Sequence, residues 1–331
     1  MSSRIEKRND KKKSKKLLWK SLLFIFSLVI LVIAYSVYQY YEGLNEAGES
    51  EVVNIKNEKV EFKGIKDEMG RINVLLLGVD SRGEEQSRTD TIMIAQYNPK
   101  NGESKIVSIM RDIYAEIPGK QNYKINTAYF LGGPELLRKT IKQNFDIDIE
   151  YYAVVDFQGF EKMVDTLAPG GIEIDVEKKM SSFLHVELQS GLQRLNGKEL
   201  LEYARFRHDA EGDFGRVRRQ QQVINTLKSE LLGLYGITKL PKLTGTIQPY
   251  VETNMDTMDR LAIARDFILN PPDDIKTLRI PVDNSYEMAD YEHAGSVIEI
   301  DKEKNSKALK DFLNGSTLDA QEKATEETKN E

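Results

Sequence analysis

A continuous apolar segment near the N-terminus restricts the fold of this chain more than any other feature. From Leu22 to Val37 the only polar residues are Ser27 and Ser36. Roughly 20 mostly apolar residues span a bilayer as a helix. Tyrosines crowd the far end of the segment, as in the aromatic belt of a membrane surface. We therefore predict one transmembrane signal-anchor helix over residues 21–41.

The basic residues before this segment set its orientation. Residues 1–20 hold nine Lys or Arg and two acidic residues, and basic flanks stay on the cytoplasmic side. The sequence therefore predicts a cytoplasmic basic segment and a single-pass type II protein of the cell membrane, with its main domain extracellular. A cleavable signal peptide is the alternative, because Val32-Ile-Ala34 resembles a cleavage site. However, the apolar run is long for a signal peptide, and the aromatic residues continue through that site.

Charge and cysteine content exclude several classes of protein. Beyond residue 20 the chain has 38 basic and 51 acidic residues, a net charge of about −13, so we expect no nucleic-acid partner. Cysteine is absent, which excludes disulfides and thiolate metal sites. Against this acidic background, five arginines fall within residues 205–219, a concentration that indicates an anionic ligand.

The rest of the chain divides into a spacer, one domain and a tail. Residues 42–70 are polar and acidic, residues 71–315 form the domain, and residues 316–331 are a tail predicted to be disordered. Strands that alternate with helices predict a layered α/β domain. The predicted strands are Ile72–Val79, Thr91–Tyr97, Lys105–Met110, Ile147–Phe157, Ile172–Val176 and Ile275–Pro281. The predicted helices are Pro134–Asn144, Phe160–Leu167, Leu195–Ala204, Arg216–Leu232 and Met258–Leu269.

Two aspartates flank the first predicted hairpin. Asp80 directly follows the strand Ile72–Val79, and Asp90 precedes the strand Thr91–Tyr97. If the two strands pair antiparallel, both carboxylates come to one edge of the sheet. Two carboxylates completed by phosphate oxygens and water make a plausible octahedral magnesium site. The alternative is a plain pair of loop acids that hydrogen-bond their own turns.

Arginines are predicted to reach the same edge. Arg111 follows the strand Lys105–Met110, which by hairpin logic runs parallel to the first strand. Arg88 lies two residues before Asp90, and the alternative for it is an exposed loop residue. The guanidinium fork donates paired hydrogen bonds to phosphate oxygens, so this edge suits a metal-bound pyrophosphate.

A second group of arginines lies far along the chain. Arg205 and Arg207 share a face only in an extended segment, so we expect the helix ending near Ala204 to run into an extended strip. Arg216 and Arg218 open the next predicted helix, whose N-terminus favours phosphate. The alternative is an arginine-rich surface balanced by nearby acids, which are Glu202, Asp209, Glu211 and Asp213.

These motifs in this order resemble the LytR–CpsA–Psr family. The matching stretches are Leu75 to Arg82, Arg88 to Thr91, Ile109 to Asp112, Lys124 to Tyr129, and Tyr203 to Arg207 followed by Arg218 to Gln221. They cover roughly residues 70–235. The short anchored form is similar to the wall teichoic acid transferases of Gram-positive bacteria. The resemblance implies a three-layer α/β/α sandwich with a central mixed sheet, preceded by one N-terminal transmembrane helix.

The resemblance also implies an activity and a set of site residues. The family moves a glycopolymer from a polyprenyl-pyrophosphate carrier to peptidoglycan, which forms a phosphodiester. Asp80 and Asp90 would hold Mg²⁺, or Mn²⁺ in its place. The pyrophosphate would be gripped by Arg88, Arg111, Arg205, Arg207 and Arg218, with Gln220 assisting. Arg82 and Arg216 would also bind the pyrophosphate, and Asp213 lies with Arg216 between the last two matching segments.

A phosphotransferase of this kind needs a group that accepts a proton. The hypothesis is that a muramic acid hydroxyl attacks the phosphorus that carries the glycan, with Arg111, Arg205 and Arg207 stabilising the charge and Asp213 as the base. Two alternatives remain open from the residues. The first is a membrane-anchored binding or regulatory protein for lipid-linked polymers, and the second is a polyprenyl-pyrophosphate pyrophosphatase.

Overall fold

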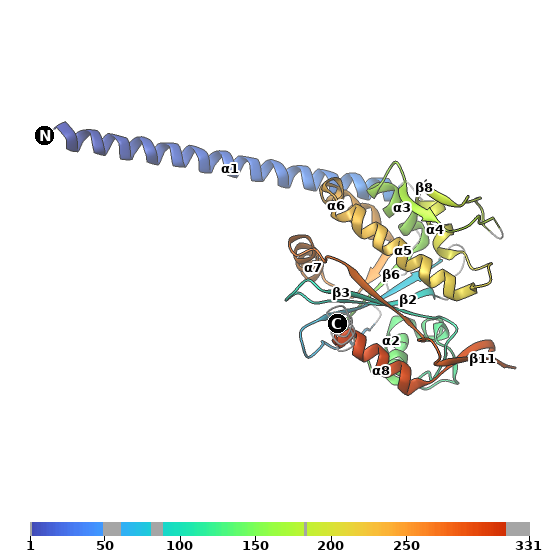
Figure 1. The fold of residues 1–331 in the computed structure, drawn as a ribbon. Helices are drawn as coiled ribbons and strands as arrows, with labels where there is room; N and C mark the ends of the chain where they lie inside the picture. The colour runs from blue at the N-terminus through green and yellow to red at the C-terminus, as the bar shows by residue number, and fades with distance from the viewer. Residues whose placement is uncertain (1, 49–60, 81–88, 182–183, 316–331) are drawn as a thin grey trace, which may run out of the picture.

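The computed structural model describes residues 2–48, 61–80, 89–181 and 184–315, and it shows a three-layer α/β/α sandwich behind a long N-terminal helix (Figure 1). The predicted fold class is confirmed. The central mixed sheet has the strand order β10 (Ile275–Ile280), β3 (Ser104–Ile109), β2 (Thr89–Tyr97), β1 (Ile72–Val79), β6 (Tyr151–Asp156) and β9 (Val251–Thr253). β1 pairs antiparallel with β2, and β2 with β3, so β1 and β3 run in the same direction.

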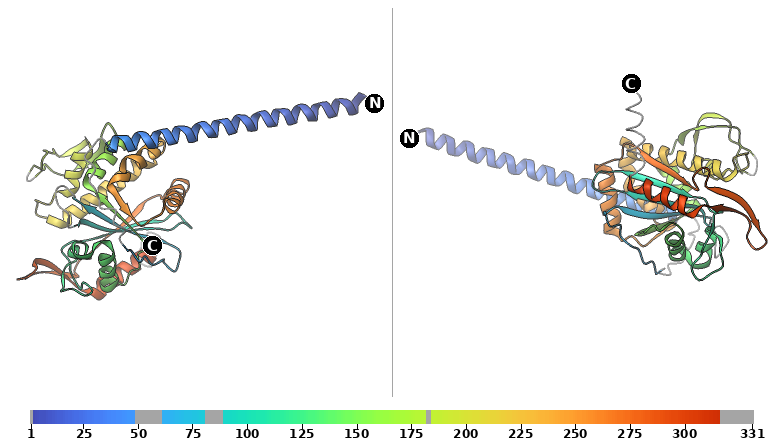
Figure 2. Two further views of the ribbon diagram at one scale, coloured as in Figure 1. Left: turned by 180° about the vertical axis from the view of Figure 1, so that it is seen from behind. Right: turned by 60° about the horizontal axis from the view of Figure 1, so that its bottom comes forward.

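Helices cover both faces of the sheet, as two further views also show (Figure 2). One face carries α2 (Asn126–Phe145) and α8 (Lys302–Asn314). The other face carries α3 (Phe157–Leu167), α4 (Gly197–Arg205), α5 (Gly212–Leu232) and α6 (Leu234–Ile247). The remaining elements are α7 (Thr257–Leu269), the 3-10 helix η1 (Gln248–Tyr250) and the paired strands β4 (Tyr114–Ala115) with β5 (Tyr123–Lys124), β7 (Ile172–Val176) with β8 (Gly191–Leu195), and β11 (Tyr286–Tyr291) with β12 (Gly295–Ile300).

The alternation of side chains along β1 decides which face is packed. Leu75, Leu77 and Val79 are buried in the main core with residues of α2 and α8. Leu76 and Gly78 point to the opposite face and are only half-buried, because that face borders a cavity. A second apolar core lies between α3, α4, α5 and the β7–β8 hairpin. The sheet and the helices of this face therefore form separate cores with space between them.

The N-terminal helix α1 (Ser2–Gly48) is continuous from the basic segment to the domain. Its part from Trp19 to Gly48 is long and apolar enough to cross a membrane. The last turns pack against α6, so residues 42–48 are helical rather than part of a loose spacer. Packing also begins before Arg71, where we expected the domain to start, because Phe62 contacts the main core. The predicted tail at 316–331 lies outside the described residues.

Candidate active site

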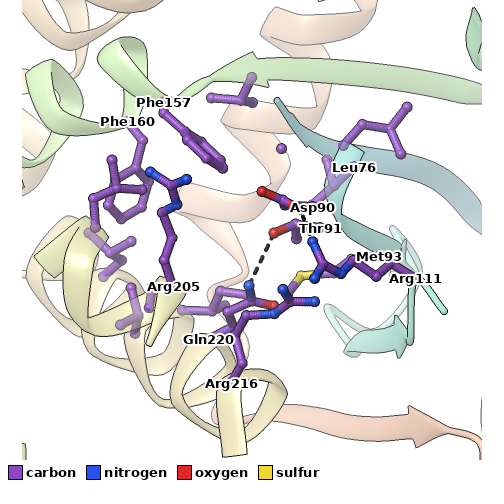
Figure 3. Close-up of a pocket in the computed structure, with 18 of the residues that line it drawn as sticks. Leu76, Asp90, Thr91, Met93, Arg111, Phe157, Phe160, Arg205, Arg216 and Gln220 are labelled. Carbon is purple, nitrogen blue, oxygen red and sulfur yellow. Dashed lines mark hydrogen bonds and ion pairs between the residues drawn. The ribbon is translucent and has the colours of Figure 1, made fainter. Parts of the chain in front are cut away.

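The cavity between the sheet and α3, α4 and α5 has a volume of about 330 Å³ (Figure 3). Its two ends differ in chemistry. Arginines and an aspartate line one end, namely Asp90, Arg111, Arg205, Arg207 and Arg216. Phe157 lies beside Arg205, and apolar side chains line the other end, including Leu76, Met93, Phe160, Met163, Val223, Ile224 and Leu227. The cavity therefore suits a ligand with an anionic head and an apolar tail.

A β-bulge gives Asp90 its place in this cavity. Val79 lies opposite Thr89 and Gly78 opposite Thr91, so Asp90 is the extra residue, with no partner across the pair. The Thr89 hydroxyl lies 2.9 Å from the Gly78 carbonyl oxygen, which closes the bulge. Bulges re-aim side chains next to active sites, and here the bulge turns Asp90 toward the cavity. As predicted, Asp80 and Asp90 lie at the same end of the β1–β2 pair.

Arg111 reaches the same edge, as the parallel direction of β1 and β3 requires. Its guanidinium forms an ion pair with Asp90, and its Nε lies 4.0 Å from a carboxylate oxygen of Asp213. The Nε–H groups of Arg111 and Arg216 are buried and find no hydrogen-bond acceptor among the residues that the structure describes. Both side chains line the cavity.

Arg205 and Arg207 lie where α4 ends. Asn196 and Glu199 form a capping box that fixes the start of this helix, and Phe206 has the extended angles φ −60°, ψ 130°. The predicted change from helix to extended strip is therefore correct, and both arginines line the cavity. Arg205 stacks over the Phe157 ring at 4.6 Å and lies 3.4 Å from Asp80.

Helix α5 separates two arginines that we predicted to act together. The helix begins at Gly212 rather than Arg216, so Arg216 and Arg218 both lie in regular helix. Residues two apart in a helix face different directions. Arg216 lines the cavity, whereas Arg218 donates to Glu177 and Glu211 and is not among the cavity residues. The structure therefore does not bring Arg218 to the cavity with the other arginines, and its role in binding pyrophosphate stays a prediction.

Gln220 and Asp213 also come from α5. Gln220 lies one turn beyond Arg216 and donates to the Thr91 hydroxyl at 3.1 Å. Asp213 accepts from Arg216 at 2.8 Å. Burial raises the pKa of Asp213 above its ordinary value, although Arg216 and Arg111 act in the opposite direction. Burial lowers the pKa of Arg216, partly offset by Asp213.

The donors at Asp80 and Asp90 fit a hard cation only in part. Carboxylate oxygens are suitable ligands for magnesium, but each aspartate contacts an arginine here. In the described ranges, no group of three or more His, Cys, Asp or Glu side chains is placed to hold a metal ion. A cation would therefore need ligand oxygens and water to complete its shell. Arg82 and Arg88 lie outside the described residues, so the structure does not place them.

One residue that supports the site was missed. Arg219 is fully buried and donates to Glu177, Asp209 and the Phe206 carbonyl, the last at 2.6 Å. It therefore holds the segment between Arg205 and Arg207 in place. The sequence held one signal for this role, which was the alternative of an arginine-rich surface balanced by nearby acids. Two of those acids do pair with arginines, Asp209 with Arg219 and Glu211 with Arg218. No comparable signal in the sequence identified the side chains of α3 that line the cavity, such as Phe160 and Met163.

The comparisons with known proteins agree with this fold. A LytR_cpsA_psr family model matches residues 37–310. The chain therefore belongs to the LytR_cpsA_psr family, and the predicted resemblance is confirmed. "Regulatory protein MsrR" of Staphylococcus aureus is 50% identical over 283 residues, which cover 85% of each chain. A Bacillus cereus protein, "Polyisoprenyl-teichoic acid--peptidoglycan teichoic acid transferase TagU", is 32% identical over 273 residues, 80% of this chain and 88% of that one.

Comparison with solved structures also finds proteins of similar fold. The crystal structure of Bacillus subtilis TagV matches with a TM-score of 0.62 and 30% identity, and the match covers 74% of this chain and 97% of that chain. A structure of TagT bound to LI-WTA matches with a TM-score of 0.57 and 26% identity, covering 79% and 97%. These relatives thus include one protein named as regulatory and one named as a teichoic acid transferase.

Proposed function

We propose that this protein transfers an anionic cell-wall glycopolymer, wall teichoic acid or a similar polymer, from a polyprenyl-pyrophosphate carrier to peptidoglycan. The observation that carries the proposal is the two-ended cavity. Its arginines match the pyrophosphate in charge, and its apolar end between the sheet and α5 matches the prenyl chain. The relative named as a teichoic acid transferase and the TagT structure bound to LI-WTA support the same substrate class.

In the proposed step, a muramic acid hydroxyl oxygen attacks the phosphorus that carries the glycan. A new phosphorus–oxygen bond forms, the bond to the bridging oxygen breaks, and polyprenyl phosphate leaves. Asp213 accepts the hydroxyl proton, a role that its raised pKa favours. Arg111, Arg205, Arg207 and Arg216 hold the pyrophosphate oxygens and offset the charge that grows on the leaving group.

Magnesium, or manganese, belongs to the proposal as the partner of Asp80 and Asp90. When bound, such an ion would neutralise charge on the pyrophosphate oxygens. To bind the cation, Asp90 would have to release Arg111, and Asp80 would have to release Arg205. The two arginines released in this way would then be free to face the anionic ligand.

The position of the protein in the cell is part of the same proposal. Helix α1 would cross the cell membrane once, with residues 1–20 in the cytoplasm and the domain outside, where peptidoglycan lies. The basic N-terminal segment and the apolar stretch from Trp19 support this arrangement.

A second candidate is a binding or regulatory protein that holds a lipid-linked polymer without turnover. The observation that favours it is the relative named regulatory protein MsrR, at 50% identity. A pyrophosphatase, with water in place of the sugar hydroxyl, would use the same arginines.

One experiment separates these functions. The full chain is incubated in detergent with a lipid-linked glycan and peptidoglycan fragments, and the products are analysed by mass. We expect glycan joined to peptidoglycan through a phosphodiester. Arg111→Ala should slow transfer about 30- to 4000-fold, because the Arg111 side chain is only 15% exposed and breaking a shielded charge contact costs about 2–5 kcal/mol. Arg194→Ala on β8, outside the cavity, is the control. Released glycan phosphate alone would indicate a pyrophosphatase, and bound but unchanged lipid a binding protein.

A further inference from the structure

The outer side of α7 is apolar and uncovered. Met258, Leu261 and Leu269 are exposed by 73%, 60% and 69% respectively, and no residue of this helix is buried. Together with Arg265 they recur every three or four residues, which places them on one face of the helix. We call this face, formed by Met258, Leu261, Arg265 and Leu269, the outer stripe of α7.

The inner side of α7 faces the domain across an apolar groove. Ile263, Phe267 and Ile268 line an apolar groove of about 240 Å³ with Leu231, Leu232 and Leu240 from α5 and α6. A surface helix normally has one apolar face and one polar face. Since the inner face of α7 meets the domain, the outer stripe is a second apolar face that nothing among the described residues covers.

The attachment of α1 to the domain determines which side of the domain faces the membrane. The Tyr40 hydroxyl donates to Gln248, and Lys242 pairs with Glu42 at 2.9 Å and Glu46 at 2.7 Å. The domain thus contacts α1 from Tyr40 onward, immediately after the apolar segment. Because the helix is continuous there, it leaves no slack between a membrane-spanning α1 and the domain. The side of the domain from which α1 projects must then face the bilayer.

Helix α7 lies on that side. In all three views, α7 and the start of α6 are at the end of the domain that is turned toward the N-terminal part of α1 (Figures 1 and 2). Tyr235, at the start of α6, is 80% exposed on this end. The β11–β12 hairpin lies at the opposite end, and Met288 on it is 64% exposed. Met288 therefore provides a matched apolar position far from the bilayer.

We propose that the outer stripe of α7 lies in the headgroup–acyl boundary of the bilayer that α1 crosses. Apolar side chains on one face of a helix enter this layer, and an arginine among them keeps its charge at the headgroups. Arg265, which is 69% exposed along its side chain, has that position. The inference rests on the proposed membrane-spanning role of α1 but not on the transfer reaction.

Insertion of the stripe into the bilayer would also orient the cavity relative to the membrane. Val223, Ile224 and Leu227 of α5 line its apolar end, and the next turn of α5 contributes Leu231 and Leu232 to the groove against α7. One helix thus carries apolar side chains from the cavity to the groove on the inner side of α7. With the stripe in the bilayer, the apolar end of the cavity lies toward the membrane and the arginine end away from it.

Site-specific labelling tests the proposal on the full chain, which has no cysteine of its own. Single-cysteine variants Leu261→Cys, Leu269→Cys, Met288→Cys and Ile30→Cys are labelled with an environment-sensitive fluorophore. They are reconstituted into phosphatidylglycerol–phosphatidylcholine vesicles that contain a spin-labelled phosphatidylcholine quencher. Each variant must melt at the wild-type temperature before labelling. We expect labels at Leu261 and Leu269 to shift to the blue and lose most of their emission, while the label at Met288 keeps its emission.

The label at Ile30 separates failure of the anchor from failure of the stripe. Quenching at Ile30 but not at Leu261 or Leu269 would overturn the proposal and leave the anchor intact. The absence of quenching at Ile30 would overturn both. Shielding of Leu261 from an aqueous quencher without lipid quenching would show that a second protein copy covers the stripe, which also contradicts the proposal. Adding Met258→Asp to the Leu269→Cys variant should restore much of the emission at 269.

Discussion

Arg218 and Arg219 are adjacent in the chain but have different roles in the structure. Arg219 is fully buried and pairs with Glu177 and Asp209. The side chain of Arg218 is 49% exposed and pairs with Glu177 and Glu211. Breaking a buried pair costs about 3–5 kcal/mol, and breaking an exposed pair about 0–1 kcal/mol. We therefore expect Arg219→Ala to lower the free energy of unfolding by several kcal/mol in denaturant titrations, and Arg218→Ala to leave it nearly unchanged. Equal losses for both variants would contradict this assignment.

Asp213 allows a pH test of the proposed base. Its carboxylate must be ionised to accept a proton, and burial raises its pKa above the ordinary aspartate value of 3.8. The transfer rate should therefore fall as the pH drops through a value above 3.8, so that the acid limb lies higher than for an exposed aspartate. Asp213→Asn should remove that limb and slow transfer by roughly 10²- to 10⁴-fold. Asp146→Asn, which loses contacts with Lys142 at 2.8 Å and Lys310 at 2.6 Å away from the cavity, is the control. An unchanged limb in Asp213→Asn would exclude this residue as the base.

At the residue scale, the sequence predicts side chains that follow strands better than those inside helices. Arg111 could be placed because hairpin pairing brings alternate strands to one edge. Arg218 could not, because its direction depends on where α5 begins, and Gly212 rather than Arg216 is the first residue. The bulge that turns Asp90 into the cavity also leaves no local signal, since it is set by the register of β1 against β2.

At the scale of elements, the crossing of α1 and α6 depends on two glycines. A Cβ atom on Gly43 would lie 2.1 Å from the Lys242 carbonyl oxygen, and one on Gly245 would lie 2.1 Å from that of Tyr40. Leucine at either position would force the helices apart, at a cost of about 1–3 kcal/mol. The domain should stay folded, because its cores are elsewhere.

Cysteine reactivity can measure this separation. Ala47 is fully buried in the crossing, so the thiol of Ala47→Cys should react slowly with maleimide. Adding Gly43→Leu should speed the reaction severalfold. Gly48→Leu is the matched control, because a Cβ there meets nothing within 4 Å. Slow labelling in both double variants would show that α1 and α6 tolerate the larger side chain.

The elements with strong periodicity were predictable, and the smaller ones were not. The prediction placed the strands of the β1–β2–β3 meander within one or two residues, because long apolar runs separated by turn residues are a clear signal. It had α2 starting after Gly132-Gly133, where the helix does kink. It missed α6, which contains Pro241, and the β11–β12 hairpin, whose strands are partly exposed. Helix α6 depends on packing against α1, and the hairpin on contacts with β4, rather than on their own patterns.

At the scale of the whole molecule, the orientation of the chain in the membrane is the prediction that all the proposals share. The nine basic residues before the apolar segment should keep the N-terminus inside, which would place the cavity outside, where the proposed peptidoglycan acceptor lies. Cysteine variants Ser14→Cys and Met288→Cys report the two sides, since the chain has no other thiol. A membrane-impermeant maleimide added to intact protoplasts should label position 288 and spare position 14, and both should react after detergent lysis. Labelling of position 14 alone would reverse the topology, and the transfer reaction would then have to be abandoned because its acceptor lies on the other side.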